Sequence, residues 1–143
     1  MSSKAFASAQ KGFAEESEKA FRFLVTDFGF AGPERIDAVL QEVSYARSGM
    51  RCRIMLDHSE MSLIAEVEVE IGDKLMIATL DNLVSAAGMA SGNNVPHNAH
   101  TVRNLGNALT GQAKFLRSLL PYLGQESVRG LMERARARQW HAR

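Results

Sequence analysis

The chain of 143 residues is 45% hydrophobic and 23% charged, which indicates one folded domain over residues 1–143 and argues against a disordered polypeptide. Its single cysteine excludes an internal disulfide and favours a reducing compartment. The sequence has neither a signal-peptide core nor a membrane-spanning run of roughly 18 apolar residues, so it predicts a cytoplasmic protein.

The formal net charge of +1 hides an uneven distribution along the chain. Residues 1–100 carry 9 Lys and Arg against 14 Asp and Glu, whereas residues 101–143 carry 8 against 2. Such a basic section can bind nucleic acid, but a basic patch alone is a weak signal. Attraction between the two parts, or arginines that solvate a terminal helix, explains the same distribution, so nucleic-acid binding through residues 129–143 remains only an alternative.

An amphipathic helix is predicted from near Ser8, or from Ser3, to Phe28. Apolar residues recur there at spacings of three, four and seven, and charged residues occupy the other positions. Gly29 is the expected C-terminal cap, because glycine adopts the left-handed conformation at little cost. Phe30 is then expected to fold back onto the helix as an apolar contact.

Alternating apolar and polar side chains predict a small antiparallel sheet of three to four strands in the middle of the chain. The expected strands are 43–47, 51–56 and 63–71, with a shorter fourth strand at 75–79. Turns are expected at residues 48–49 and 72–73. Residues 34–40 fit either a short helix after Pro33 or an extended segment, and the pattern does not decide between them.

A short helix over residues 82–87 is predicted next, with Asp81 as its N-cap and Gly88 at its end. Turn-forming residues make 89–96 the clearest loop of the chain. The fold class is therefore α+β: an N-terminal helix, a small antiparallel sheet, and C-terminal helices that pack on one face of it.

Two C-terminal helices are predicted. A long helix is expected from near Asn98, with Pro121 and Gly124 ending it. Gly106 and Gly111 each weaken it by roughly 1 kcal/mol relative to alanine, which leaves a bend or a later start open. A last helix opens at residue 126 or 127 and carries outward-facing arginines as far as Arg138.

The histidines and the cysteine form no recognisable site in the sequence. His97 and His100 lie three residues apart, but a zinc site needs three or four protein ligands and no third one is nearby. Arg51 and Arg53 would lower the pKa of the Cys52 thiol if they approached it, yet Cys52 shares its strand face with apolar residues. We therefore expect a solvated histidine pair and a buried, inert cysteine, without metal or cofactor.

Enzyme motifs are also missing from the sequence. It contains no glycine-rich phosphate loop, no His-Glu-x-x-His and no Gly-x-Ser-x-Gly. We therefore predict that the protein is not an enzyme. A pocket that joins His58, His97 or Cys52 to a carboxylate would favour an enzyme instead.

Glu66, Glu68 and Glu70 form an acidic row on one face of a predicted strand. Three interpretations are open: acid–base catalysis, a soluble strand face paired with Arg51 or Arg53 across the sheet, and recognition of a basic protein. We take these five residues together as the candidate partner-binding surface.

The order of elements resembles that of small bacterial immunity proteins of polymorphic or contact-dependent toxin systems. The likeness rests on a helix ending at Gly29-Phe30, a short sheet over about 43–79, and C-terminal helices with the segment Gln-Ala-Lys-Phe-Leu-Arg at 112–117. It spans about residues 13–139 as a pattern, and it implies an intracellular binder that occludes a toxin. Immunity proteins of nuclease toxins are often strongly acidic, whereas this chain is not, which leaves the toxin's chemistry open.

The sequence thus predicts a non-enzymatic protein-binding module, with an immunity protein and its cognate toxin as the leading interpretation. A chaperone or adaptor for a secreted protein is the alternative within the same class of binders. A nucleic-acid-binding regulator that uses the basic C-terminal section is the alternative in a different class.

Overall fold

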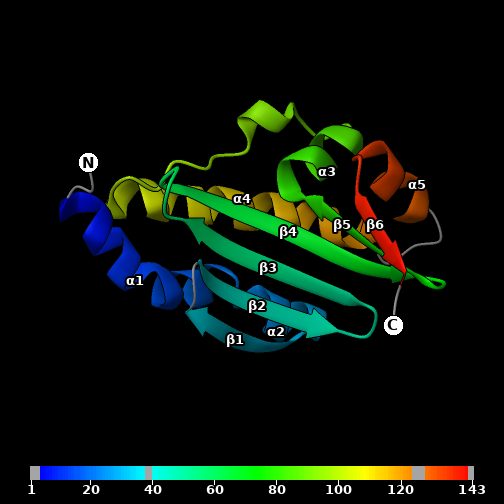
Figure 1. The fold of residues 1–143 in the computed structure, drawn as a ribbon, viewed down its shortest axis with the longest axis horizontal. Helices are drawn as coiled ribbons and strands as arrows, with labels where there is room; N and C mark the ends of the chain where they lie inside the picture. The colour runs from blue at the N-terminus through cyan, green and yellow to red at the C-terminus, as the bar shows by residue number, and fades with distance from the viewer. Residues whose placement is uncertain (1–3, 38–39, 124–127, 142–143) are drawn as a thin grey trace.

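A computed structural model of the chain describes residues 4–37, 40–123 and 128–141 and has an α+β fold (Figure 1). The first half contains α1 (Lys4–Ala20), α2 (Phe23–Phe28), β1 (Ala31–Asp37), β2 (Gln41–Arg47), β3 (Met50–Asp57), β4 (Ser62–Ile71) and β5 (Lys74–Thr79). The second half contains α3 (Leu80–Ala86), the 3-10 turn η1 (Gly92–Asn94), α4 (Val102–Leu123), α5 (Val128–Arg134) and β6 (Arg138–His141).

The strands form one antiparallel sheet in chain order, from β1 to β6. The first five strands follow one another directly, whereas β6 returns after the C-terminal helices and pairs with β5 (Figure 1). The strands β2 to β5 confirm the predicted alternating segments and their turns. The predicted count of three to four strands is too low, because the sheet has six strands in the described residues: β6 was missed, and the segment of β1 was left open.

The strand β1 settles the segment that the sequence left open. Residues 34–37 pair with β2 as an antiparallel strand, with Arg35 opposite Val43. All residues of β1 are exposed, so the strand has no apolar side for a sequence pattern to reveal. It is attached to the first helix by Arg35, which donates to Glu18 at 2.9 Å and holds the pKa of that carboxyl below its usual range.

The strand β6 corrects the prediction of a last helix that extends to Arg138. The helix α5 ends at Arg134, and the Ala137 N–H donates to the Met132 carbonyl at 3.0 Å. Arg136 takes a left-handed conformation with a φ of 57°, which turns the chain out of the helix and into β6. The predicted start of this helix at residue 126 or 127 lies outside the described residues.

The predicted N-terminal helix is two helices in the structure. The first helix ends at Ala20 and the second begins at Phe23. Where they meet, the Leu24 N–H donates to the carbonyl of Phe21, three residues earlier, instead of to the carbonyl four residues earlier as in an α-helix. The predicted helix end is confirmed: Gly29 has a φ of 73°, and Phe30 is buried while its N–H donates to Leu24.

Two predicted helix boundaries are wrong. Thr79, not Asp81, is the N-cap of α3, and Asp81 lies in the first turn of the helix. The helix α4 begins at Val102 rather than near Asn98, and it continues through Pro121 to Leu123, directly before Gly124. Pro121 has no N–H to donate to the carbonyl four residues earlier, so one hydrogen bond of the helix is missing near its end.

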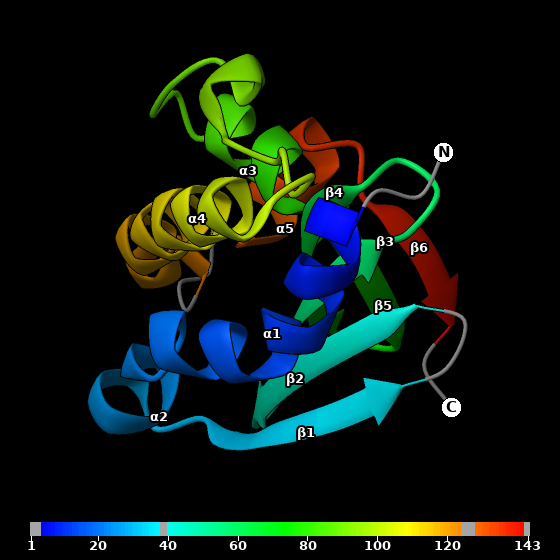
Figure 2. The ribbon, with the colours of Figure 1, turned by 90° about the vertical axis from the view of Figure 1, so that its left-hand side faces the viewer.

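The helices α1 and α4 cover one face of the sheet, which we call the inner face, and α3 and α5 pack against β5 (Figure 2). The core lies between them, and its sheet side chains are Val43, Tyr45, Met50, Cys52, Ile54, Leu56, Leu63, Ala65, Val67, Val69, Met76 and Ala78. The opposite face, which we call the outer face, is covered by no helix of the described chain. None of the described helices is long and apolar enough to cross a bilayer.

Candidate functional site

The outer face brings together the five residues that the sequence singled out. Arg51 lies opposite Glu68 and Arg53 lies opposite Glu66 across the β3–β4 pair, while Glu70 lies opposite Leu75 of β5. Residues that face each other across antiparallel strands share one side of the sheet. The three glutamates and two arginines therefore form one continuous surface.

The ion pairs on this surface run diagonally across the strands. Arg53 Nη2 lies 2.9 Å from Glu68 Oε1, although the residue directly opposite Arg53 is Glu66. Glu66 Oε2 is instead 3.0 Å from Arg138 Nη2 of β6. The Glu66 and Glu68 side chains are only 14% and 17% exposed, so both carboxylates are largely enclosed by their partners.

The ion-paired side chains also cover the centre of the outer face. Ile77 lies between Glu68 and Arg138 in the strand register and is only 7% exposed, although no helix covers it. Ser44 is likewise buried and lies 3.5 Å from Arg51 Nη1. Arginine and glutamate stems bury neighbouring side chains in this way while their charged ends stay at the surface.

Glu70 differs from the other two glutamates of the row. It is exposed and makes no ion pair within the described residues. A partner would therefore meet Glu70 as a free carboxylate, whereas Glu66 and Glu68 would present a charge that an arginine already balances.

Exposed apolar side chains lie at the two ends of the outer face. Trp140 of β6 is 47% exposed, with the Arg138 guanidinium 5.4 Å from its ring centre, and Ile36 of β1 is 42% exposed. Tryptophan and arginine are the residue types that most often dominate binding energy at protein interfaces. Sequence reasoning named none of these three residues as a site residue, because it missed β6 and left the segment of β1 open. A four-residue strand such as β6 carries almost no periodic signal.

Cys52 lies in the core, as expected. It is 1% exposed, and burial raises the pKa of its thiol to about 12, against a smaller opposing effect of Arg47. Arg51 and Arg53 point to the outer face, away from the sulfur. The thiol is therefore held protonated and enclosed.

The two histidines of interest lie beside β4 but do not form a ligand set. His100 Nδ1 is 2.8 Å from Asn98 Oδ1, and the His97 backbone carbonyl accepts the Leu63 N–H at 2.7 Å. Within ranges 4–37, 40–123 and 128–141, no three His, Cys, Asp or Glu residues are placed to hold a metal ion.

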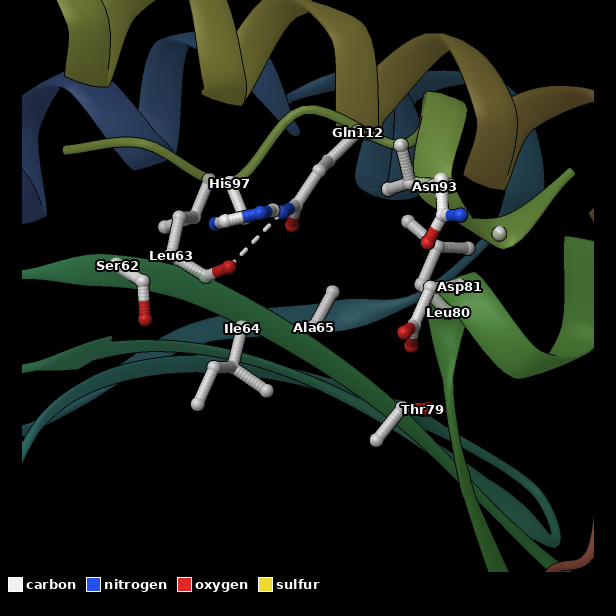
Figure 3. A pocket seen from close by; sticks show the side chains of 12 residues that line it. Ser62, Leu63, Ile64, Ala65, Thr79, Leu80, Asp81, Asn93, His97 and Gln112 are labelled. Atoms are coloured by element: carbon white, nitrogen blue, oxygen red, sulfur yellow. Dashed lines mark hydrogen bonds between the residues drawn. The ribbon is translucent and has the colours of Figure 1, made fainter. Parts of the chain in front are cut away.

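A pocket of about 570 Å³ lies where β5 separates from β4. The two strands pair only from Glu66 onward, so the edge of β4 before it faces the loop that carries His97. His97 and Asp81 both line the pocket, which is the type of combination that would favour an enzyme. In Figure 3 His97 and Asp81 lie at opposite ends of the pocket, and no hydrogen bond joins them.

Gln112 of α4 forms the inner wall of this pocket. Its Nε2 donates to the Leu63 carbonyl at 3.0 Å and to the Pro96 carbonyl at 2.8 Å, so it ties the helix to both β4 and the loop (Figure 3). Its Oε1 is buried and has no hydrogen-bond partner among the described residues. Gly111 allows the close approach, because a Cβ there would lie 2.3 Å from Pro96 Cγ.

No protein-family model, curated protein or solved structure matches this chain significantly.

Proposed function

We propose that this protein is a non-enzymatic binding module whose outer face binds a basic protein surface, as an immunity protein binds its cognate toxin. The observation that supports this most directly is the outer face itself. It presents charged and aromatic side chains from several strands without a covering layer in the described chain. A sheet face of this kind offers a broad, rigid surface for a folded partner.

The sign of the partner's charge follows from the side chains on this face. Acidic residues outnumber basic ones there: Glu34, Glu42, Glu66, Glu68 and Glu70 against Arg51, Arg53 and Arg138. Complementary charge steers association and selects among partners, so an acidic face favours a basic one. The free carboxylate of Glu70 is the strongest contributor, because no described arginine balances it.

The pattern of charge favours an immunity protein over a chaperone for an unfolded segment. Chaperones that hold unfolded chains need an exposed apolar groove, whereas here Ile77 is enclosed by Glu68 and Arg138. A surface with fixed ion pairs and apolar residues only at its ends suits a folded partner with a defined charge pattern.

Binding to the products of neighbouring genes tests this proposal. We expect one of them to co-purify with the protein, and its measured toxicity to fall when the two are produced together. Glu70→Lys should weaken that binding by about tenfold or more, equivalent to about 1.4 kcal/mol. Glu15→Lys is the matched control, since Glu15 is exposed and lies on α1, which covers the opposite face of the sheet.

Two results would count against the proposal. If no neighbouring gene product binds, the immunity role is wrong. If a partner binds and Glu70→Lys and Trp140→Ala both leave its affinity unchanged, the outer face is not the binding surface.

A further inference from the structure

The pocket between β4 and the loop after α3 carries a negative charge, which favours cationic ligands over anionic ones. Asp81 is the single carboxylate among its described lining residues, and none of these is a lysine or arginine. Asp81 is exposed and forms no ion pair within the described part of the chain. An anion would find no opposite charge here, whereas a cation would find one.

The inner wall adds a second acceptor for hydrogen bonds. Gln112 Oε1 is buried and unpartnered, while the amide nitrogen beside it is fully used by the Leu63 and Pro96 carbonyls. Leaving such an oxygen without a donor is unfavourable, because it has lost its hydrogen bonds to water. A ligand that brings an N–H donor to the inner wall would recover part of that cost.

The other described residues that line the pocket include several apolar side chains. Ala65, Leu80 and Val95 are buried residues that line it, and Thr79 lies beside them. The volume of about 570 Å³ lies within the range of pockets that hold small molecules.

We propose that this pocket binds a primary ammonium group on a short alkyl chain. The ammonium has three donors and no acceptor, which suits a wall whose unpaired polar groups are acceptors, the Asp81 carboxylate and the Gln112 amide oxygen. The alkyl chain packs against the apolar wall. A free alkylamine and a lysine side chain of a partner protein share this chemistry, and the inference does not depend on partner binding at the outer face.

Titration of the isotope-labelled protein with n-pentylamine, followed by NMR, tests the proposal. We expect saturable shifts of the Gln112 side-chain amide and of the backbone amides of Leu63 and Ala65. The matched ligands 1-pentanol and pentanoate, which keep the chain and replace the cation, should bind at least several-fold more weakly. Equal binding of pentanol, or shifts confined to other parts of the protein, would overturn the proposal.

Asp81→Asn should weaken pentylamine binding by about threefold to fivefold, as expected for an exposed ion pair. Asp37→Asn is the matched control, since Asp37 lies on β1 away from the pocket, and it should leave the affinity unchanged. If Asp81→Asn has no effect, or if a crystal grown with pentylamine shows only an ordered water at Gln112 Oε1, the ammonium assignment is wrong.

The same titration separates the two sources of the ammonium. A capped lysine peptide that binds more tightly than pentylamine, and more tightly than its norleucine analogue, identifies a protein side chain as the occupant. Tighter binding of the free amine identifies a small molecule. Failure of every amine would refute this inference and would leave the toxin-binding proposal untouched, because none of these ligands requires the outer face.

Discussion

Arg138 of β6 lies 3.0 Å from Glu66 of β4, and the pair crosses over the intervening strand β5. It joins residues that are 72 positions apart. A second arginine of the C-terminal section, Arg117, lies 2.8 Å from Asp27 of α2. At least two basic side chains of residues 101–143 therefore pair with acidic residues of the same chain. This supports the interpretation that the basic C-terminal section is attracted to the acidic residues 1–100.

We expect the Arg138–Glu66 pair to make a small but measurable contribution to stability. Arg138 is 61% exposed, so solvent screening limits the coupling to about 0.2–1 kcal/mol. A double-mutant cycle with Arg138→Ala and Glu66→Gln, measured by urea unfolding, gives the coupling free energy directly. Arg134→Ala serves as the control, because Arg134 is exposed on α5. A coupling energy of zero would show that the pair does not attach β6 to the sheet.

The two glycines inside α4 should respond to alanine in opposite directions. At Gly106 nothing lies within 4 Å of an added Cβ, so Gly106→Ala should stabilise the protein by about 0.5–1 kcal/mol. At Gly111 the added Cβ would lie 2.3 Å from the rigid ring of Pro96. The loop must shift, and we expect Gly111→Ala to destabilise by about 1–3 kcal/mol. Equal stabilisation by both, in thermal or chemical unfolding, would mean that the loop does not pack closely on α4.

Removal of one buried hydroxyl should stabilise the protein. The Tyr45 side chain is buried, and its hydroxyl has no hydrogen-bond partner among the described residues. Tyr45→Phe removes that group with little change in shape, so we expect the free energy of unfolding to rise by about 1 kcal/mol. Tyr122→Phe, at an exposed position on α4, should have almost no effect. A loss of stability in Tyr45→Phe would reveal a partner for the hydroxyl.

Stability should fall at high pH because of Cys52. Its pKa is raised from 9.0 to about 12 in the folded protein, so folding favours the protonated thiol. This contribution is fully present below pH 9.0 and is lost as the pH rises toward about 12. Tyr45, whose pKa burial raises from 10.0 to about 12, acts in the same direction. Urea unfolding across this range should show the decline, and it should be shallower in Cys52→Ala.

The same burial predicts that the thiol is unreactive in the folded state. A disulfide reagent at neutral pH should label Cys52 only as fast as the protein unfolds, and immediately in denaturant. Rapid labelling of the native protein would show that the inner face of β3 opens without global unfolding.

The sequence alone determined the two faces of the central strands. Alternation along β3 and β4 placed Cys52 in the core and the acidic row outside, because neighbouring side chains of a strand point to opposite faces wherever the strand lies. It also determined the end of the N-terminal helical region at Gly29, since the cap depends on a single residue's backbone freedom. Both features are local, so no distant part of the chain was needed to predict them.

Only the tertiary structure decided the edges of the sheet and the pocket beside β4. The strands β1 and β6 are held by backbone pairing to a neighbour, and their side chains carry no apolar alternation of their own. Gln112 meets the carbonyl of Leu63, 49 residues earlier in the chain, because Gly111 lets the loop approach α4 closely. Contacts of this kind depend on the path of the whole chain, and no local pattern of residue types encodes them.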